Sequence, residues 1–202
     1  LLHMMGGLDT PTSGSVMVRD KELAKMNDEQ LTIFRRRNIG FIFQNYNLVP
    51  ILNVYENIVL PVELDGDTVD QKFMADVVSM LGLEDKLDVR MGALSGGQRQ
   101  AVALLMATMT PLKFLILDEH TAALDPKTAE VIMALTDRVI REKHLTAMMV
   151  THNLRYAVEY GDRILMMNRG RVVLDRAGAE KRATSMDDIL TMFNQISLET
   201  GN

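Results

Sequence analysis

Two adjacent carboxylates stand at the end of an apolar run, where they could bind a metal ion and activate water. The run 115–117 reads as a buried strand, and Asp118 and Glu119 follow it directly. Ligands of open α/β sheets bind at the carboxyl ends of the strands, so both acids are expected to face a site. Asp118 can hold Mg²⁺ directly or through water, and Glu119 can orient and deprotonate an attacking water. The plainer alternative is that the two acids only begin a loop.

A second group of residues has the chemistry of phosphate binding. Ser95, Gly96, Gly97 and Gln98 follow Leu94 and precede a long helical pattern. Two glycines let the backbone approach a ligand closely, and the amides at the start of the helix point toward phosphate oxygens. A simple helix cap after a glycine turn would explain Ser95 and the two glycines taken separately. The complete string 94–98 is much more specific than such a cap.

Two single polar residues complete the candidate site. Gln44 follows the apolar run 39–43, and His152 follows the run 147–151. Each would leave its strand at the same edge of the sheet as Asp118 and Glu119. Either residue alone would be read as a polar side chain at a loop entrance, but their matching positions favour a shared site.

The elements that position these residues predict an α/β fold with a mostly parallel sheet flanked by helices. Expected strands are 14–18, 39–43, 113–117, 146–151, 163–167 and 171–174. Expected helices are 27–36, 53–64, 69–81, 98–109, 126–142, 153–159 and one that begins after Ser185, which forms a capping pair with Asp188. The three successive helices between 53 and 109 indicate a helical insertion into the sheet.

Composition excludes several other classes of protein. The chain has 202 residues, of which 47% are hydrophobic, and a net charge of −5, as expected for one globular domain. It has no cysteine, so thiol chemistry, disulfides and cysteine zinc sites are excluded. No apolar run approaches the roughly 20 residues of a membrane span. We interpret the basic cluster 35–37 as a solvated helix end and expect no nucleic-acid partner.

The order of these motifs resembles the ATP-binding cassette (ABC) ATPases along essentially the whole chain. The matching segments are Gln44, the string 94–98, the run 117–119, Ala123-Leu124-Asp125 and His152. The resemblance implies a P-loop NTPase-like fold. It also implies a RecA-like core at about 1–47 and 111–177, a helical subdomain at about 48–110, and a C-terminal helix at about 185–197.

The resemblance also implies a role for each residue. Gln44 resembles the Q-loop glutamine, which contacts Mg²⁺ and the attacking water and links the site to a membrane subunit. Asp118 resembles the Walker B aspartate that binds Mg²⁺, and Glu119 resembles the catalytic glutamate. Asp125 resembles the D-loop aspartate at the dimer interface, and His152 resembles the switch histidine that contacts the γ-phosphate of ATP.

The string 94–98 resembles the signature motif, which closes over ATP bound to a second subunit. The implied protein is therefore an ATP- and Mg²⁺-dependent ATPase that works as a homodimer or heterodimer. Its membrane partner would be a permease, so that it lies peripherally on the cytoplasmic face of the cell membrane. The sequence identifies neither the transported solute nor the direction of transport.

One expected motif is absent from residues 1–202. Relatives carry a phosphate-binding loop directly before the segment that resembles Leu1 to Gly14, and no Gly-Lys-Ser/Thr triplet occurs in these residues. We therefore expect a truncation before or within the Walker A helix, with very weak ATP binding and negligible turnover for these residues alone. His120 replaces the proline of many relatives, and we expect that change to have little effect on chemistry.

The two halves of the chain resemble different subfamilies. Residues 1–64 resemble ATPases of macrolide exporters and lipoprotein-releasing systems, and residues from 94 onward resemble those of importers of amino acids and other small solutes. Two alternative functions stay open. One is a catalytically impaired cassette that keeps only permease or partner binding. The other, a cassette protein acting on ribosomes or DNA, ranks last because such proteins have tandem cassettes or coiled-coil insertions.

Overall fold

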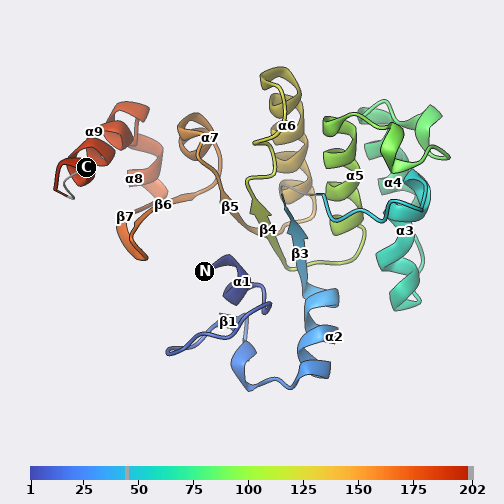
Figure 1. Cartoon of the computed structure of the whole chain (residues 1–202), viewed down its shortest axis with the longest axis horizontal. Helices are drawn as coiled ribbons and strands as arrows, with labels where there is room; N and C mark the ends of the chain where they lie inside the picture. Colours follow the sequence, from blue (N-terminus) through green and yellow to red (C-terminus); the bar gives the residue numbers. More distant parts are fainter. Residues whose placement is uncertain (44–45, 200–202) are drawn as a thin grey trace. The chain divides into compact units, whose positions relative to one another are not determined.

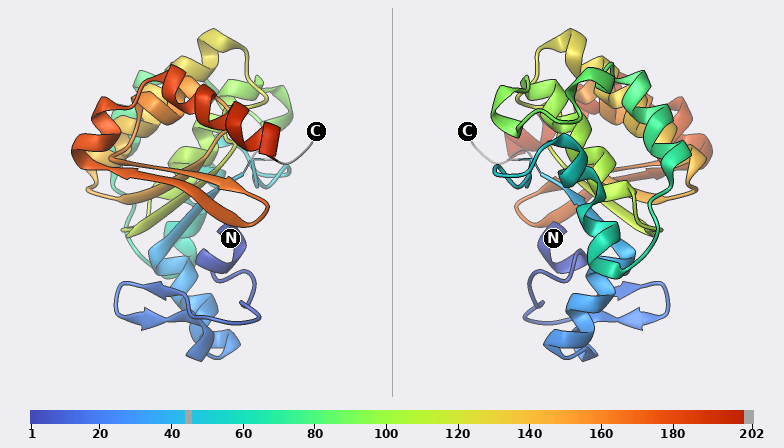
Figure 2. Two further views of the ribbon diagram at one scale, coloured as in Figure 1. Left: turned by 90° about the vertical axis from the view of Figure 1, so that its left-hand side faces the viewer. Right: turned by 90° about the vertical axis from the view of Figure 1, so that its right-hand side faces the viewer.

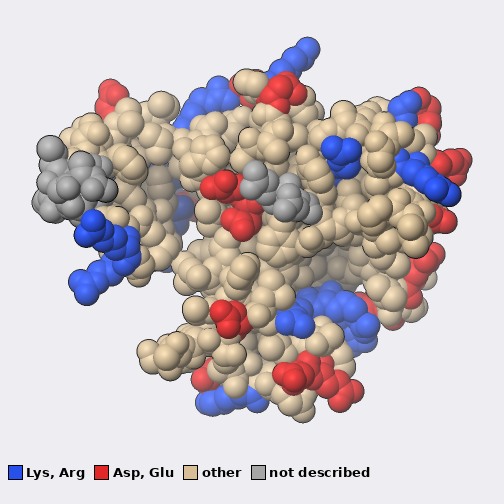
Figure 3. Space-filling model, in the orientation of Figure 1, with Lys and Arg blue, Asp and Glu red and all other residues tan. Residues whose placement is uncertain are grey.

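The computed structural model describes residues 1–43 and 46–199. The chain divides into two compact units, Leu1–Val150 and Thr151–Asn202, and each is described by itself. Within the described ranges, no helix is both long and apolar enough to cross a membrane. Acidic and basic side chains are interspersed over the face drawn in Figure 3.

The first unit begins with a short helix and a hairpin. Helix α1 (Leu2–Met5) precedes strands β1 (Met17–Val18) and β2 (Lys21–Glu22), which pair antiparallel. The strand predicted at 14–18 is therefore confined to two residues, because its partner β2 is equally short. The 3-10 turn η1 (Leu23–Lys25) leads to helix α2 (Asp28–Asn38), which passes directly into the sheet (Figure 2).

A parallel sheet of three strands positions the two carboxylates. Strands β3 (Ile39–Ile42), β4 (Phe114–Asp118) and β5 (Thr146–Val150) lie in the order β3-β4-β5 (Figure 1). Both pairs are parallel, with Ile42 opposite Leu117 and Asp118 opposite Val150. The carboxyl ends of all three strands therefore share one edge. The α/β fold predicted from the sequence is confirmed.

Helices fill the connections between these strands. Between β3 and β4 the chain forms α3 (Val54–Asp65), α4 (Gln71–Met80), the 3-10 turns η2 (Glu84–Lys86) and η3 (Met91–Ala93), and α5 (Gly96–Thr108). Helix α6 (Pro126–Glu142) connects β4 to β5 over the range predicted. These helices belong to the same compact unit as the sheet, and the division into a core and a helical subdomain stays a prediction.

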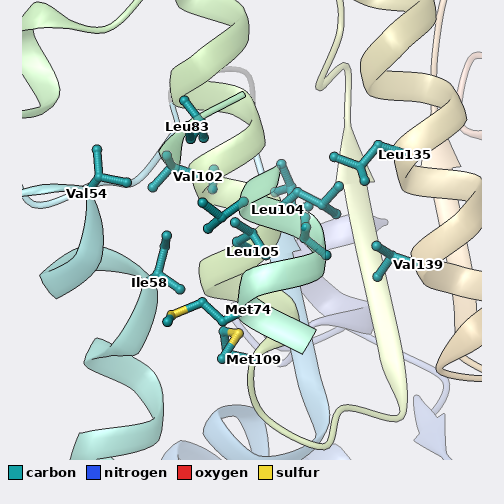
Figure 4. Close-up of a cluster of buried hydrophobic side chains, with 14 of the residues drawn as sticks. Val54, Ile58, Met74, Leu83, Val102, Leu104, Leu105, Met109, Leu135 and Val139 are labelled. Atoms are coloured by element: carbon teal, nitrogen blue, oxygen red, sulfur yellow. The ribbon is translucent and has the colours of Figure 1, made fainter. Parts of the chain in front are cut away.

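One hydrophobic cluster joins the helices to the sheet. It combines side chains of α3, α4, α5 and α6 with others from β3 and β4, and ten of its members are labelled in Figure 4. Leu105 of α5, Val54 and Ile58 of α3, and Leu115 of β4 have no exposed surface. Helix α5 is thus fixed between the preceding helices and the strand that carries the carboxylates.

The arginines at the end of α2 are not simply solvated. Arg35 Nη1 donates a hydrogen bond of 2.6 Å to the carbonyl of Gly7. Arg36 Nε lies 2.6 Å, and Arg37 Nε 3.7 Å, from Asp65 Oδ1, whose side chain is only 5% exposed. The interpretation as a solvated helix end is therefore wrong for Arg35, which connects α2 to the turn after α1. Arg36 and Arg37 are exposed and pair with the end of α3.

The second unit is built around a hairpin. Helix α7 (Leu154–Glu159) precedes strands β6 (Arg163–Asn168) and β7 (Arg171–Ala177), followed by α8 (Gly178–Ala183) and α9 (Met186–Glu199). The predicted pair of Ser185 and Asp188 caps α9, with mutual hydrogen bonds of 2.8 and 3.2 Å. Helix α8 was not predicted, because its six residues are mostly exposed and carry no apolar periodicity.

Candidate functional site

The chain reverses direction immediately after Asp118 at the end of β4. Glu119 adopts a left-handed backbone conformation with φ of +47°, which is uncommon for a residue with a side chain. Its amide donates a hydrogen bond of 3.0 Å to the carbonyl of Val150 at the end of β5. Strain of this kind persists only where the surrounding structure enforces it, and it is concentrated at functional sites. The backbone of Glu119 is therefore held in place at the edge of the sheet, next to Asp118.

His120 lies inside the protein directly after this turn. Its side chain is 3% exposed and its Nε2 lies 3.3 Å from Thr136 Oγ1 on α6. The single hydroxyl proton of Thr136 is directed at the carbonyl of Ile132, 2.8 Å away, so Nε2–H of a neutral imidazole is the donor to Thr136. The sequence treated position 120 as a loop variation, but the residue anchors the loop to α6.

Burial of His120 makes stability depend on pH. Desolvation lowers its pKa from 6.5 to about 4. As the pH falls from 6.5 to 4, His120 therefore takes up a proton in the unfolded chain but not yet in the folded chain. The stability that comes from the neutral form of His120 is fully present above pH 6.5 and is lost as the pH falls toward 4. Between pH 7.5 and 5 we expect this histidine to reduce the free energy of unfolding by about 2 kcal/mol.

Urea unfolding at both pH values measures this loss. His120→Leu is expected to remove most of it, because the replacement has a similar volume and no titrating group. His144→Asn, which changes an exposed histidine, serves as the matched control and should retain the wild-type dependence. Equal pH dependence in the His120→Leu variant and the wild type would show that the imidazole is not held neutral.

The string 94–98 forms the start of helix α5. Ser95 is the N-cap and accepts a hydrogen bond of 3.3 Å from the Gln98 amide, and the Gln98 side chain accepts one of 2.9 Å from the Ser95 amide. This reciprocal pair is a capping box. The Ser95 hydroxyl that the sequence offered to a ligand is thus part of the cap. The amides of Gly96 and Gly97 come from the same first turn, whose dipole favours an anion.

The start of α5 lies against the loop that follows the carboxylates. A Cβ added to Gly96 would lie 3.5 Å from Leu124 Cδ2, two residues after the turn at Ala122. Asp125 is the N-cap of α6 and accepts a hydrogen bond of 3.1 Å from the Thr128 amide. Hydrogen bonds from the side chain and amide of Thr128 hold the pKa of the Asp125 carboxyl below its usual value. The predicted residues 95–97, 118, 119 and 125 therefore belong to one compact unit.

Gly97 is required by the close approach of α5 to α6. A Cβ at this position would overlap Cγ2 of Thr128. We expect Gly97→Ala to destabilise the fold by about 1 kcal/mol. The steric overlap destabilises it by more than the higher helix propensity of alanine stabilises it. Adding Thr128→Ser removes the methyl group and should restore or exceed wild-type stability in thermal unfolding. A stabilising effect of Gly97→Ala alone would contradict this packing.

A buried asparagine that the sequence did not single out holds the loop before α3. Asn57 has no exposed surface. Its Oδ1 accepts a hydrogen bond of 2.8 Å from the amide of Val49, and its Nδ2 donates to the carbonyls of Val49, Leu52 and Asn53 at 3.1, 3.3 and 2.9 Å. One side chain thus fixes the segment that begins shortly after Gln44.

Two predicted residues, Gln44 and His152, remain to be located. Gln44 lies outside the described residues; β3 ends two residues before it, at the same edge as Asp118. His152 follows the end of β5 and is counted with the second compact unit. The gathering of residues 44, 118, 119 and 152 around one ligand therefore stays a prediction.

Comparison with known proteins identifies the family. The family described as "ABC transporter" matches residues 1–122. The tyrosine transport ATP-binding protein of Clostridioides difficile is 36% identical, over 96% of this chain and 80% of that protein. The methionine import ATP-binding protein MetN of Haemophilus influenzae is 37% identical, over 86% of this chain and 50% of that protein. The chain thus spans about half the length of that MetN relative.

A solved structure agrees with these sequence relatives. The dimeric ATP-binding cassette MJ0796, in a post-hydrolysis state bound to ADP and Pi, superposes with a TM-score of 0.76 at 34% identity. The superposition covers 87% of this chain and 78% of that one. With the carboxylates at the end of β4 and the capped glycine turn of α5, the chain belongs to the ABC transporter family as an ATP-binding cassette domain.

Proposed function

We propose that the protein hydrolyses ATP to power transport of a small solute through a membrane permease. The observation that carries the proposal is the pair Asp118 and Glu119 at the carboxyl end of β4, with Glu119 held in a left-handed turn against β5. Carboxylate oxygens fit Mg²⁺, which prefers hard oxygen ligands and accompanies the phosphates of ATP. Import is the favoured direction, because MetN is named as a methionine importer.

Each residue of the site has a proposed role in this reaction. Asp118 would hold Mg²⁺, which supplies charge neutralisation on the phosphates. Glu119 would accept a proton from the attacking water, with Gln44 and His152 positioning the water and the γ-phosphate. The amides at 95–97, with Ser95 and Gln98, would face the ATP of a second subunit, and Asp125 would lie at the interface between the subunits. Hydrolysis would therefore require a dimer.

The partner and the location follow from the same proposal. A permease would bind the surface around residues 44–64, where Ile51 is 79% exposed at the tip of the loop that Asn57 holds. This contact would keep the protein at the inner face of the membrane. A cassette that binds its permease but does not hydrolyse ATP is the second candidate, because permease binding needs only this exposed loop and not the carboxylates at the end of β4.

Two measurements test the proposal and separate the candidates. The first is release of phosphate from ATP by the protein, with and without Mg²⁺. We expect turnover that depends on Mg²⁺. The second is co-purification with a membrane protein after mild detergent extraction. Co-purification without turnover would favour the binding-only cassette, and loss of both would reject the transport function.

A further inference from the structure

We propose that Arg99 is a positioning residue for the turn 94–97, which it ties to the segment that follows Gln44. The inference rests on the proposed function and deepens it, because this turn is the part of the chain expected to face ATP on a second subunit. Arg99 Nη1 donates a hydrogen bond of 2.8 Å to the carbonyl of Leu94. Its Cζ also lies 5.3 Å from the ring centroid of Tyr46.

The two contacts are made by one guanidinium group. The hydrogen bond holds the residue that precedes the Ser95 cap, and the ring contact holds the residue that comes two positions after Gln44. A planar guanidinium can donate a hydrogen bond in its plane while its face packs on an aromatic ring. Arg99 is therefore suited to both contacts at once.

The hydroxyl of Tyr46 also lies beside the glycine turn. A Cβ added to Gly96 would come within 3.2 Å of this hydroxyl, and within 3.5 Å of Leu124 Cδ2 on the other loop. The first residue of α5 is thus enclosed by the segment after Gln44 and by the loop after Glu119. A shift of Tyr46 would be transmitted to the amides of Gly96 and Gly97.

Tyr46 itself has a defined position. Its backbone φ is +30° and that of Asn47 is +49°, both in the left-handed region. Asn57 then holds Val49 through hydrogen bonds to its amide and its carbonyl. The side chain of Tyr46 also packs against the hydrophobic cluster that includes α3 and α5, so its position does not depend on Arg99 alone.

The location of Arg99 argues against a role as a mere surface charge. It occupies the first turn of α5, where the helix dipole disfavours a cation. The contacts with Leu94 and Tyr46 offset that cost. A direct attraction between Arg99 and a phosphate would offset it too. The two explanations differ in whether Tyr46 is needed, and that difference can be measured.

A double-mutant cycle in the full-length protein provides the test. Arg99→Met and Tyr46→Leu are each expected to lower kcat for ATP hydrolysis about tenfold, because small displacements of a catalytic group are costly. The KM for ATP should change less than twofold, since the turn acts on ATP held by the other subunit. The double variant should be no slower than either single variant, because both break the same connection.

Matched variants complete the design. Tyr46→Phe keeps the aromatic face and should be faster than Tyr46→Leu. Arg138→Met removes an exposed arginine from α6, which pairs with Glu142 at 2.6 Å, and should leave kcat unchanged. Multiplied losses in the double variant would indicate that Arg99 acts on phosphate directly and would overturn the proposal, as would wild-type kcat in Arg99→Met.

Hydrogen exchange separates failure of this inference from failure of the proposed function. The Gln98 amide, which donates to Ser95 Oγ in the helix cap, should exchange faster in Arg99→Met and Tyr46→Leu than in the wild type and in Arg138→Met. A wild type without Mg²⁺-dependent turnover would reject the proposed function. The exchange rates would then still test whether Arg99 holds the turn 94–97. Unchanged exchange in both variants would reject the positioning role of Arg99, whatever the activity.

Discussion

Glu119→Gln in the full-length protein is expected to lower the rate of ATP hydrolysis about 100- to 1000-fold while ATP binding persists. The amide keeps the shape of the carboxylate and its place in the turn after β4, but it cannot accept a proton from water. The rate of phosphate release under saturating ATP and Mg²⁺, and binding of a fluorescent ATP analogue, measure the two effects separately.

The variant also gives a test of the dimer. If each site needs a second subunit, the Glu119→Gln protein should accumulate as an ATP-bound dimer in size-exclusion chromatography and dissociate when ATP is removed. Glu142→Gln, at the exposed end of α6, is the matched control and should hydrolyse ATP at the wild-type rate. Substantial turnover by Glu119→Gln would assign the proton acceptor to another residue.

Asn57→Leu is expected to cost about 3 kcal/mol of folding free energy, because buried backbone groups lose their partners. The replacement has a similar size but leaves the amide of Val49 and the carbonyls of Val49 and Leu52 without their side-chain hydrogen bonds. Urea unfolding measures the loss, and hydrogen exchange at the Val49 amide shows whether it is local to the loop before α3.

Asn53→Ala provides the comparison for that experiment. Asn53 caps α3 through the amide of Glu56, and its loss should cost about 1 kcal/mol. The Val49 amide should stay protected in this variant, because its acceptor on Asn57 is intact. Protection of the Val49 amide in Asn57→Leu would mean that the loop is held by other contacts.

The sequence was sufficient to predict the frame of the site. Strand β4 is a continuous apolar run that ends in two acids, and such a run in an α/β pattern indicates a buried parallel strand. Helix α6 begins at Pro126 after the cap Asp125, a start signal that placed it correctly. Both predictions depend on local patterns that the folded chain preserves.

The contacts that hold the site could not be predicted in this way. His120 reads as a polar loop residue, and only the packing of α6 over the loop reveals that it is buried against Thr136. Asn57 sits in an apolar helix with no local signal for the loop carbonyls it binds. Arg99 and Tyr46 are more than fifty positions apart, and neither the type nor the spacing of these residues specifies their contact.

The parallel pairing of β3 with β4 has a consequence for the order in which the chain folds. Ile39 pairs with Phe114, and residues 43–113 lie between the two strands. The chain must therefore close this long loop before the strands can pair. Closing so long a loop carries a large entropic cost, whereas the contacts within α3 and α5 form over short distances along the chain. The nascent polypeptide should therefore acquire its helices early, and the strand edge that bears the two acids should assemble only in the slow, late phase of folding.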